Sequence, residues 1–212
     1  MQMRNGFTSI FIPMAGITTN EDKEMMRIIT GKARGIRLKT LEGDATRPTA
    51  ERVKEAVFSM LQFDIEGRQV LDLFAGSGQL GLEAVSRGAA HAVLVDKSKA
   101  AVKIIEENAI KTKLALDCTI KLSDATDYLR RNRGTKFDII FLDPPYASGL
   151  YAPILRLMLE CQILKPTSLI VCESDTAAIF SGDESLAEVF EVKKSSQYSR
   201  TVVTVLSPKE EK

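Results

Sequence analysis

The chain has few of the residues from which disulfide frameworks and metal sites are built. Among its 212 residues there are three cysteines and one histidine. The cysteines form no C-x-x-C pair, which predicts buried thiols in a reducing compartment. His91 has no cysteine or second histidine near it in the sequence, so we expect a solvent-facing strand start there. The composition therefore gives no support to a disulfide scaffold or a metal centre.

Long apolar runs and a strong excess of one charge are also absent. No run reaches the length of a membrane span, and we expect a cytoplasmic protein that does not bind membranes. With 29 basic and 28 acidic residues the net charge is +1, so the chain as a whole is not an obvious polyanion binder. A chain of this length with 44% hydrophobic content can bury a full core. We expect one domain over 26–207 and a charged tail over 208–212.

Short apolar segments alternate with helical patterns from Val70 to Ile170. This alternation predicts an α/β fold with a doubly wound parallel sheet. We expect its strands to begin at Val70 and to cover 92–95, 118–122, 137–142 and 168–172. Two later segments, 188–193 and 200–206, are expected to add an antiparallel hairpin, which makes seven strands.

The tetrapeptide Asp143-Pro144-Pro145-Tyr146 directly follows the apolar run 137–142. In open α/β sheets, ligands bind at the carboxyl ends of the strands. The prolines stiffen the backbone, so the Asp143 carboxylate and the Pro144 carbonyl become fixed acceptors, and Tyr146 can offer a flat face. Two acceptors beside a stacking surface suit an exocyclic amine of a nucleobase. The alternative is an ordinary turn at a strand end.

A glycine-rich turn follows the first expected strand. Its spacing from Gly76 is G-x-G-x-x-G, and a helix over 80–86 follows it. Asp96, at the end of the next strand, lies about 20 residues beyond the glycines, where an acid can accept hydrogen bonds from ribose hydroxyls. The pattern fits NAD(P), FAD or an adenosyl cofactor. A tight turn without a ligand is the alternative.

Acidic residues end four of the expected strands: Asp72, Asp96, Asp124 and Asp143. A carboxylate at position 72 would repel a pyrophosphate and suits a cationic ligand. This cleft therefore favours a ligand with a positive charge and hydroxyl groups, which describes S-adenosylmethionine. Asp124 could instead, or in addition, cap the helix expected over 126–131.

Together these motifs resemble those of class I S-adenosylmethionine-dependent methyltransferases that methylate amines. Three further segments are more specific: Arg-Ile-Ile-Thr-Gly-Lys-Ala-Arg-Gly at 27–35, Thr-Arg-Pro-Thr at 46–49 and Arg-Val-Lys-Glu-Ala-Val-Phe at 52–58. With them the chain resembles, over about residues 26–206, the bacterial RsmD family, which methylates N2 of a guanine in 16S ribosomal RNA. That family usually has Tyr-Gly-x-Thr where this chain has Tyr198-Ser199-Arg200-Thr201. We expect this departure to change a turn and not the function.

The resemblance implies a seven-stranded Rossmann-like methyltransferase sheet with an N-terminal β-hairpin and helix. It implies S-adenosyl-L-methionine as the cofactor and 16S rRNA as the substrate, within a small-subunit particle, for a monomeric enzyme. The catalytic residues would be Asp143, Pro144 and Tyr146. The cofactor contacts would be Asp72, Phe74, Gly76, Ser77, Gly78, Asp96, Asp124, Arg47 and Thr49. From the residues alone, 47–49 indicates only a rigid helix start.

The segment 27–40 is basic and contains no acidic residue. Gly31 and Gly35 bracket a turn, which predicts a β-hairpin with several charges on one face. Its cations are expected to contact RNA: Arg27, Lys32, Arg34, Arg37 and Lys39. A solvated surface hairpin is the alternative. Residues 1–25 precede the point where family members would begin, so we expect an extension with little order or an unused upstream start.

The sequence is compatible with two other functions. The acceptors that suit the guanine amine would serve the N6 amine of adenine in DNA or RNA equally well. A non-catalytic RNA-binding assembly factor could also retain the fold, although it would have no need of a complete cofactor cleft.

Overall fold

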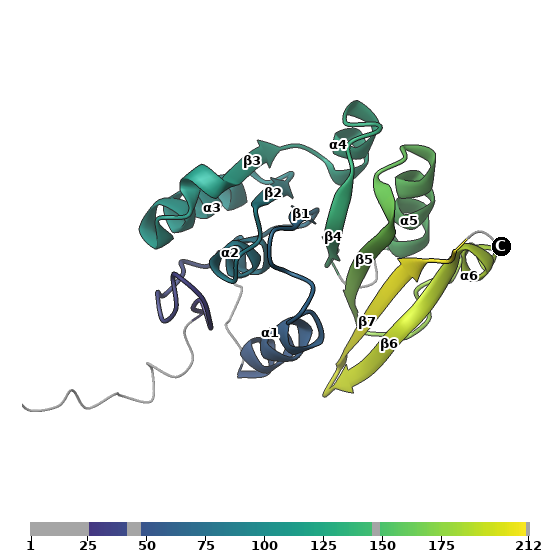
Figure 1. Ribbon diagram of the computed structural model, residues 1–212, viewed down its shortest axis with the longest axis horizontal. Coiled ribbons are helices and arrows are strands. Elements are labelled where there is room, and N and C mark those ends of the chain that lie inside the picture. Colours follow the sequence, from purple (N-terminus) through teal and green to yellow (C-terminus); the bar gives the residue numbers. More distant parts are fainter. Residues whose placement is uncertain (1–25, 42–47, 146–148, 211–212) are drawn as a thin grey trace, which may run out of the picture.

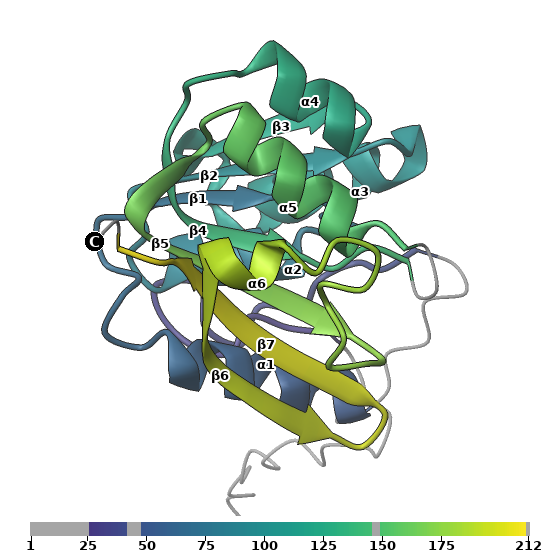
Figure 2. The ribbon, with the colours of Figure 1, turned by 90° about the vertical axis from the view of Figure 1, so that its right-hand side faces the viewer.

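The computed structural model describes residues 26–41, 48–145 and 149–210, with side chains from Glu51 onward in the first helix. Seven strands form one sheet in the order β3-β2-β1-β4-β5-β7-β6 (Figures 1 and 2). The strands are β1 (Gln69–Asp72), β2 (His91–Asp96), β3 (Cys118–Leu122), β4 (Phe137–Leu142), β5 (Leu164–Ser174), β6 (Phe190–Tyr198) and β7 (Thr201–Pro208). The helices are α1 (Pro48–Met60), α2 (Gln79–Ser86), α3 (Lys99–Thr112), η2 (Ala115–Asp117), α4 (Ala125–Arg131), α5 (Tyr151–Glu160) and α6 (Leu186–Val189).

The first five strands are parallel, and the order of the sheet reverses beside β1. That strand pairs with β2 on one side and with β4 on the other. The connections therefore leave β1 and β4 in opposite directions, which opens a crevice at the carboxyl ends of these strands. All six residues of β4 are buried, as the apolar run predicts for a strand covered on both faces.

Two hydrophobic cores cover the two faces of the sheet. One contains Val57 of α1, Leu82 of α2 and Ile105 of α3. The other contains Leu129 of α4 and Leu155 of α5. Each such fully buried side chain contributes roughly 1.5–3 kcal/mol through the hydrophobic effect. The helices thus form two layers, as a doubly wound fold requires (Figure 2).

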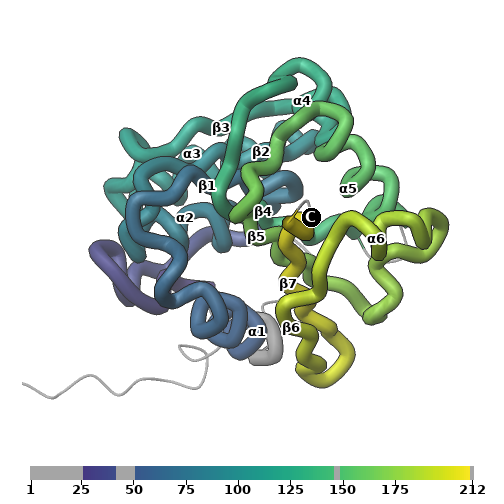
Figure 3. The backbone as a smooth tube through the Cα atoms, turned by 45° about the vertical axis from the view of Figure 1, so that its right-hand side comes forward, coloured from purple at the N-terminus to yellow at the C-terminus, as the bar shows by residue number. Residues whose placement is uncertain are grey.

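The antiparallel end of the sheet agrees with the expected hairpin, with longer strands. β7 pairs with both β5 and β6, and α1 lies beside these last two strands (Figure 3). At the hairpin tip Ser199 has a φ of 57°. The turn therefore holds the left-handed conformation that glycine adopts most easily. Serine at this position keeps the hairpin, so the expected change of turn is small. The tail expected over 208–212 begins later, since Pro208 ends β7 and the Lys209 N–H donates to the Val189 carbonyl at 2.8 Å.

The N-terminal segment 26–41 folds back on itself as predicted, but as an irregular hairpin without regular strands. Its two arms are joined by an isolated antiparallel bridge between Arg27 and Arg37, and the Leu38 N–H donates to the Met26 carbonyl at 2.8 Å. Other backbone groups of the segment bond to the rest of the protein, chiefly to α2. The Lys32 N–H donates to the Ser86 carbonyl at 2.9 Å. A Cβ on Gly31 would lie 1.8 Å from that same carbonyl oxygen, so only glycine allows this close approach.

A buried acid fixes this segment. Glu83 of α2 is fully buried and accepts the N–H groups of Ile29 at 2.7 Å and Thr30 at 3.0 Å. Its charge is balanced by Arg87 at 2.7 Å, with the Nζ of the buried Lys54 at 3.9 Å. Burial, opposed by Glu83, lowers the pKa of Lys54 to about 8. The sequence pattern did not predict this network, because a lysine and a glutamate on helices are ordinarily exposed.

Candidate active site

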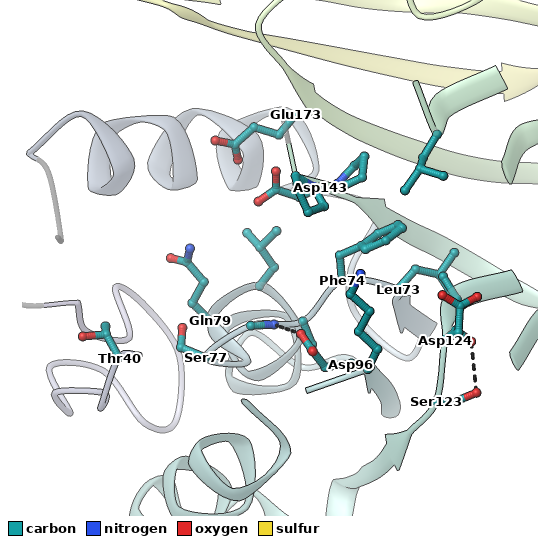
Figure 4. A pocket seen from close by; sticks show the side chains of 18 of the residues that line it. Thr40, Leu73, Phe74, Ser77, Gln79, Asp96, Ser123, Asp124, Asp143 and Glu173 are labelled. Atoms are coloured by element: carbon teal, nitrogen blue, oxygen red, sulfur yellow. Dashed lines mark hydrogen bonds between the residues drawn. The ribbon is translucent and has the colours of Figure 1, made fainter. Parts of the chain in front are cut away.

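A cavity of about 800 Å³ opens at the carboxyl ends of the parallel strands (Figure 4). It is bounded by the loop between β1 and α2, by the ends of β2, β3, β4 and β5, and by the N-terminal segment. The lining residues are Met26, Thr40, Leu73, Phe74, Ala75, Gly76, Ser77, Gln79, Leu80, Asp96, Lys97, Ser123, Asp124, Ala125, Asp143, Pro144, Pro145, Leu150 and Glu173. The structure thus brings acids from four strand ends to one cavity.

The glycine turn forms the floor of the cavity. Gly76 has a φ of 54°, and a Cβ at this position would meet nothing within 4 Å. Its backbone is therefore open to the cavity, where a ligand can approach closely. Gly78 serves packing instead, since a Cβ there would lie 3.1 Å from Ile105 and 3.2 Å from Leu94. Phe74 and Ser77 line the cavity, whereas Gly78 is not among the described lining residues.

Asp96 is held in place by the backbone. One carboxylate oxygen accepts the Gly76 N–H at 2.9 Å and the other accepts the Ser98 N–H at 2.8 Å. The two bonds orient the carboxylate without using all of its lone pairs. The side chain lines the cavity, so it remains able to accept a hydrogen bond from a ligand hydroxyl.

Asp124 caps α4, as one of the two interpretations of the sequence predicted. Its Oδ1 accepts the Thr126 N–H at 2.8 Å and the Thr126 hydroxyl at 2.7 Å. The hydrogen bond from the Thr126 side chain is the largest of the effects that lower the pKa of Asp124. Asp124 also lines the cavity, so a contact with a ligand amine stays a prediction.

Asp72 lies beneath the turn and is not among the described residues that line the cavity. It is 2% exposed, and its Oδ2 accepts the Gly81 N–H at 3.1 Å. Burial raises its pKa to about 7. This placement supports a role in fixing the start of α2. It does not support the expected direct contact with a ligand ammonium.

Gln79 is a cavity residue that the sequence reasoning missed. Its Oε1 is buried and has no hydrogen-bond partner among the described residues. A buried acceptor without a donor is costly unless a ligand or water supplies one. Gln79 directly follows the Gly76-Ser77-Gly78 turn. This position is the only feature of the sequence that could have indicated it as a cavity residue.

Asp143, Pro144 and Pro145 form the opposite wall with Glu173, which the sequence reasoning also missed. Burial raises the pKa of Glu173 to about 7. The expected fifth strand stopped at Cys172, whereas β5 continues to Ser174 and carries Glu173 into the cavity. Tyr146 and Arg47 lie outside the described residues, as does the side chain of Thr49.

Several cations of the basic segment are paired with acids of the described residues. Arg27 contacts Glu51 at 2.7 Å. Lys32 contacts Asp117 at 2.9 Å, and Lys39 contacts Glu107 at 2.5 Å. Exposed pairs of this kind are worth about 0–1 kcal/mol, so a phosphate could displace the acids. Arg34 and Arg37 are exposed on the turn and on the second arm.

Comparisons with known proteins agree with the fold. The family model described as Conserved hypothetical protein 95 matches residues 26–206. The Bacillus subtilis protein YlbH, named as an rRNA methyltransferase, is 40% identical over 152 residues, which are 71% of this chain and 83% of the relative. Ribosomal RNA small subunit methyltransferase D of Escherichia coli strain K12 is 38% identical over 150 residues, which are 71% of this chain and 75% of the relative.

A solved structure of the Escherichia coli methyltransferase yhhF superposes with a TM-score of 0.75 at 30% identity, and covers 88% of this chain and 99% of that chain. The protein is thus a methyltransferase with a Rossmann-like fold. It belongs to the family described as Conserved hypothetical protein 95, which is the RsmD family.

Two other kinds of feature are absent from the part of the chain that the structure describes. No helix there is long and apolar enough to cross a membrane. No group of three or more histidine, cysteine or acidic side chains there is placed to hold a metal ion.

Proposed function

We propose that this protein transfers a methyl group from S-adenosyl-L-methionine to the exocyclic N2 amine of a guanine in 16S ribosomal RNA. The observation that supports this most directly is the cavity itself, which places the glycine turn and Asp96 opposite the Asp143-Pro144 wall. The names of its RsmD relatives support ribosomal RNA of the small subunit as the substrate.

The residues of the cavity fit the proposed cofactor. The open backbone at Gly76 would admit its methionine part, and the unpartnered Oε1 of Gln79 would accept a hydrogen bond from its ammonium. Asp96 would accept hydrogen bonds from the ribose hydroxyls, and Asp124 one from the adenine amine. The cofactor supplies an electrophilic methyl group on a sulfonium.

The chain's own contribution to the reaction is to orient and polarise the amine. The lone pair of guanine N2 is delocalised into the ring, so the amine is a poor nucleophile. The Asp143 carboxylate and the Pro144 carbonyl would accept its two N–H groups and shift electron density toward nitrogen. The same bonds aim the lone pair at the methyl carbon, so positioning and electrostatics supply most of the acceleration. The methylated amine must lose one proton, for which we propose the Asp143 carboxylate as acceptor, and the cofactor would leave as S-adenosylhomocysteine. The guanine must leave any base stack to enter the cavity, and Tyr146 would stack on it there.

Nucleotide-resolution mapping of methylation in 16S rRNA, with and without the gene, tests this proposal. We expect one guanine to lose its N2 methyl group in the deletion strain and to regain it on complementation. Methylation of an adenine would instead support the N6 alternative. A protein that binds no S-adenosylmethionine in calorimetry would support the assembly-factor alternative. The same mapping on free RNA and on small-subunit particles identifies which of the two is the substrate.

The basic segment is the proposed RNA surface, and we propose contacts through phosphates because its cations are dense and it carries no aromatic side chain. Each lost phosphate contact should flatten the dependence of log affinity on log salt by roughly 0.7–0.9. Replacing Arg34 and Arg37 together by alanine should weaken RNA binding and reduce this slope, while cofactor affinity stays unchanged. Lys193→Ala and Lys194→Ala on β6 test the rival RNA surface, which lies near these lysines and Arg200, and on the present proposal they should change neither. If the Arg34 and Arg37 double variant keeps the wild-type RNA affinity and salt slope, the basic segment is not the RNA surface.

A further inference from the structure

Glu173 is an acid of the cavity to which the proposed chemistry gives no role. It lies at the carboxyl end of β5, directly beside the strand that ends at Asp143. The parallel register pairs Phe141 with Val171 and Leu142 with Cys172, so the next residues of the two strands are Asp143 and Glu173. Neighbouring strands lie about 4.8 Å apart, which makes these two acids immediate neighbours.

Both carboxylates face the same space. Figure 4 shows the side chains of Asp143 and Glu173 together on one side of the cavity, across from Gln79 and Ser77. Cys172 and Ser174, on either side of Glu173, are fully buried, and so is its partner on β7, Val203. The backbone of Glu173 is fixed as well, because its carbonyl accepts the Tyr151 hydroxyl. The backbone that carries this side chain is therefore fixed, and the partly buried carboxyl lines the cavity.

The Glu173 carboxyl has no hydrogen-bond donor or cation paired with it among the described residues. The burial that raises its pKa to about 7 is not offset by any such partner. Desolvated polar groups without partners are rare in native proteins, because each costs about 1–3 kcal/mol. Asp96, in contrast, receives two backbone N–H groups in the same cavity. The partly buried Glu173 carboxyl faces the cavity, where it can accept a hydrogen bond from a ligand donor.

Guanine carries such a donor next to its amine. Its Watson–Crick edge presents the N1–H beside the two hydrogens of N2, so it offers donors at adjacent positions. Adenine presents an unprotonated N1 acceptor beside its amine. A carboxylate next to the amine site therefore attracts guanine, and it repels adenine through opposed lone pairs.

We propose that Glu173 is the specificity-determining residue of the site, and that its carboxylate accepts the N1–H of the target guanine while Asp143 and the Pro144 carbonyl hold the N2 amine. This inference rests on the proposed function. It explains how a site whose amine acceptors would suit either purine selects guanine. A site built to pair a donor rejects an analogue that lacks it, because the buried acceptor is then left unpaired.

The test combines a change in the protein with the removal of one substrate proton. The substrate is 16S rRNA assembled by ligation, free or reconstituted into particles, with the mapped nucleotide carried as guanine or as 2-aminopurine. The analogue keeps the N2 amine and lacks the N1–H. The wild type should prefer guanine in kcat/KM by about 10- to 100-fold, the value of one hydrogen bond to a charged group.

Glu173→Ala should slow methylation of guanine by a similar factor and remove the preference, so that both substrates react at nearly equal rates. Glu173→Gln keeps the volume and can donate to the analogue's N1, so it should shift the preference toward 2-aminopurine even if the alanine variant folds poorly. Binding of S-adenosylhomocysteine, measured by calorimetry, should match the wild type in both variants. Glu191→Ala, an exposed glutamate on β6, is the matched control and should retain the wild-type preference.

Equal slowing of both substrates by Glu173→Ala and Glu173→Gln, with the preference intact, would assign Glu173 a structural role and overturn the inference. Unchanged kinetics in both variants would overturn it as well. Failure of the proposed function gives a different result, since the wild type would then leave guanine unmethylated or would methylate an adenine.

Discussion

The two sides of the cavity hold their carboxylates in different ways. On the cofactor side, Asp96 and Asp124 each accept at least one backbone N–H from the loop or helix that follows. On the base side, Glu173 receives no donor from the described residues. Carboxylates of the first kind are fixed and solvated by the backbone before any ligand arrives. The Glu173 carboxylate instead receives its donor only from the substrate. The resulting loss of stability must be offset by interactions elsewhere in the fold.

We infer from this difference that Asp96 and Asp124 bind the cofactor and that Asp143 and Glu173 contact the purine. A ligand that is held through hydroxyls needs acceptors already in place, because preorganisation lowers the cost of binding. Recognition of a base through its own N–H groups instead uses acceptors whose hydrogen bonds are completed only by that base. We therefore expect changes on the base side to reduce turnover or selectivity, and changes on the cofactor side to reduce affinity or stability.

The largest effect is expected on the base side. Asp143→Ala removes the carboxylate that would orient the N2 amine, and kcat should fall by about 10²- to 10⁴-fold. Single-turnover methylation of the RNA measures this, and calorimetry with S-adenosylhomocysteine should give nearly wild-type affinity. Asp175→Ala removes an exposed acid close to the end of β5 and is the control. Activity within a few-fold of wild type in Asp143→Ala would remove this residue from the chemistry.

Asp72 provides the next largest effect, in stability and not in turnover. Burial raises its pKa to about 7 from an ordinary 3.8, so the native state binds this proton more tightly than the unfolded state. The free energy of unfolding should therefore fall as pH rises from about 4 to about 7, and it should not recover at higher pH. Asp72→Asn keeps an acceptor for the Gly81 N–H and removes the titration. Its stability should depend less on pH in this window.

At pH 8 this variant should be more stable than the wild type by about 2–4 kcal/mol, the free-energy equivalent of a pKa shift of that size. Urea unfolding at pH 4.5 and pH 8 measures both values. The cofactor affinity of the variant distinguishes a role of Asp72 in fixing the loop from a direct contact with the cofactor. If Asp72 only fixes the loop, the cofactor affinity of Asp72→Asn should stay within about twofold of the wild type. If Asp72 contacts the ligand ammonium directly, the variant should lose cofactor affinity as well as the pH dependence of its stability.

Asp96 tests the cofactor side directly. Asp96→Ala should weaken S-adenosylmethionine binding by about 1–3 kcal/mol, because ribose hydroxyls lose their acceptor and the Gly76 N–H loses its partner. Calorimetric titration measures the change. Asp96→Asn should recover part of it, since the amide oxygen can still accept. Unchanged affinity in the alanine variant would place Asp96 outside the binding site.

How much the sequence could predict differs between the same two sides. Asp96 ends β2 and Asp124 follows β3, two strands that the sequence indicated, so the parallel sheet brought both to the cavity as expected. Glu173 escaped prediction because β5 extends two residues beyond its apolar run, and strand ends depend on pairing with neighbours rather than on the run itself. Asp72 was expected in the cavity because its strand ends there, but its side chain turns under α2 to the Gly81 N–H.

The N-terminal segment shows the other limit of sequence reasoning. Alternating cations and two glycines predicted a β-hairpin, and the chain forms an irregular one that also bonds to α2. Glu83 and Lys54 decide this, because burying either alone would be costly, and together with Arg87 and the backbone of the segment they are satisfied. A pattern along one segment cannot reveal partners that come from two distant helices.

The smallest effect is expected at the hairpin behind the base side. Ser199 holds a φ of 57°, which costs a residue with a Cβ about 1–2 kcal/mol relative to glycine. Ser199→Gly relieves that strain but gives the unfolded chain more freedom, which offsets roughly half of the gain. The net increase in stability should be about 0.5–1 kcal/mol, as measured by urea unfolding. Because β7 pairs with Glu173 at Val203 and not at the hairpin tip, methylation should keep its wild-type kcat and preference. A changed preference for guanine over 2-aminopurine in Ser199→Gly would mean that the hairpin tip helps to position Glu173, and that the base side depends on the whole antiparallel end of the sheet.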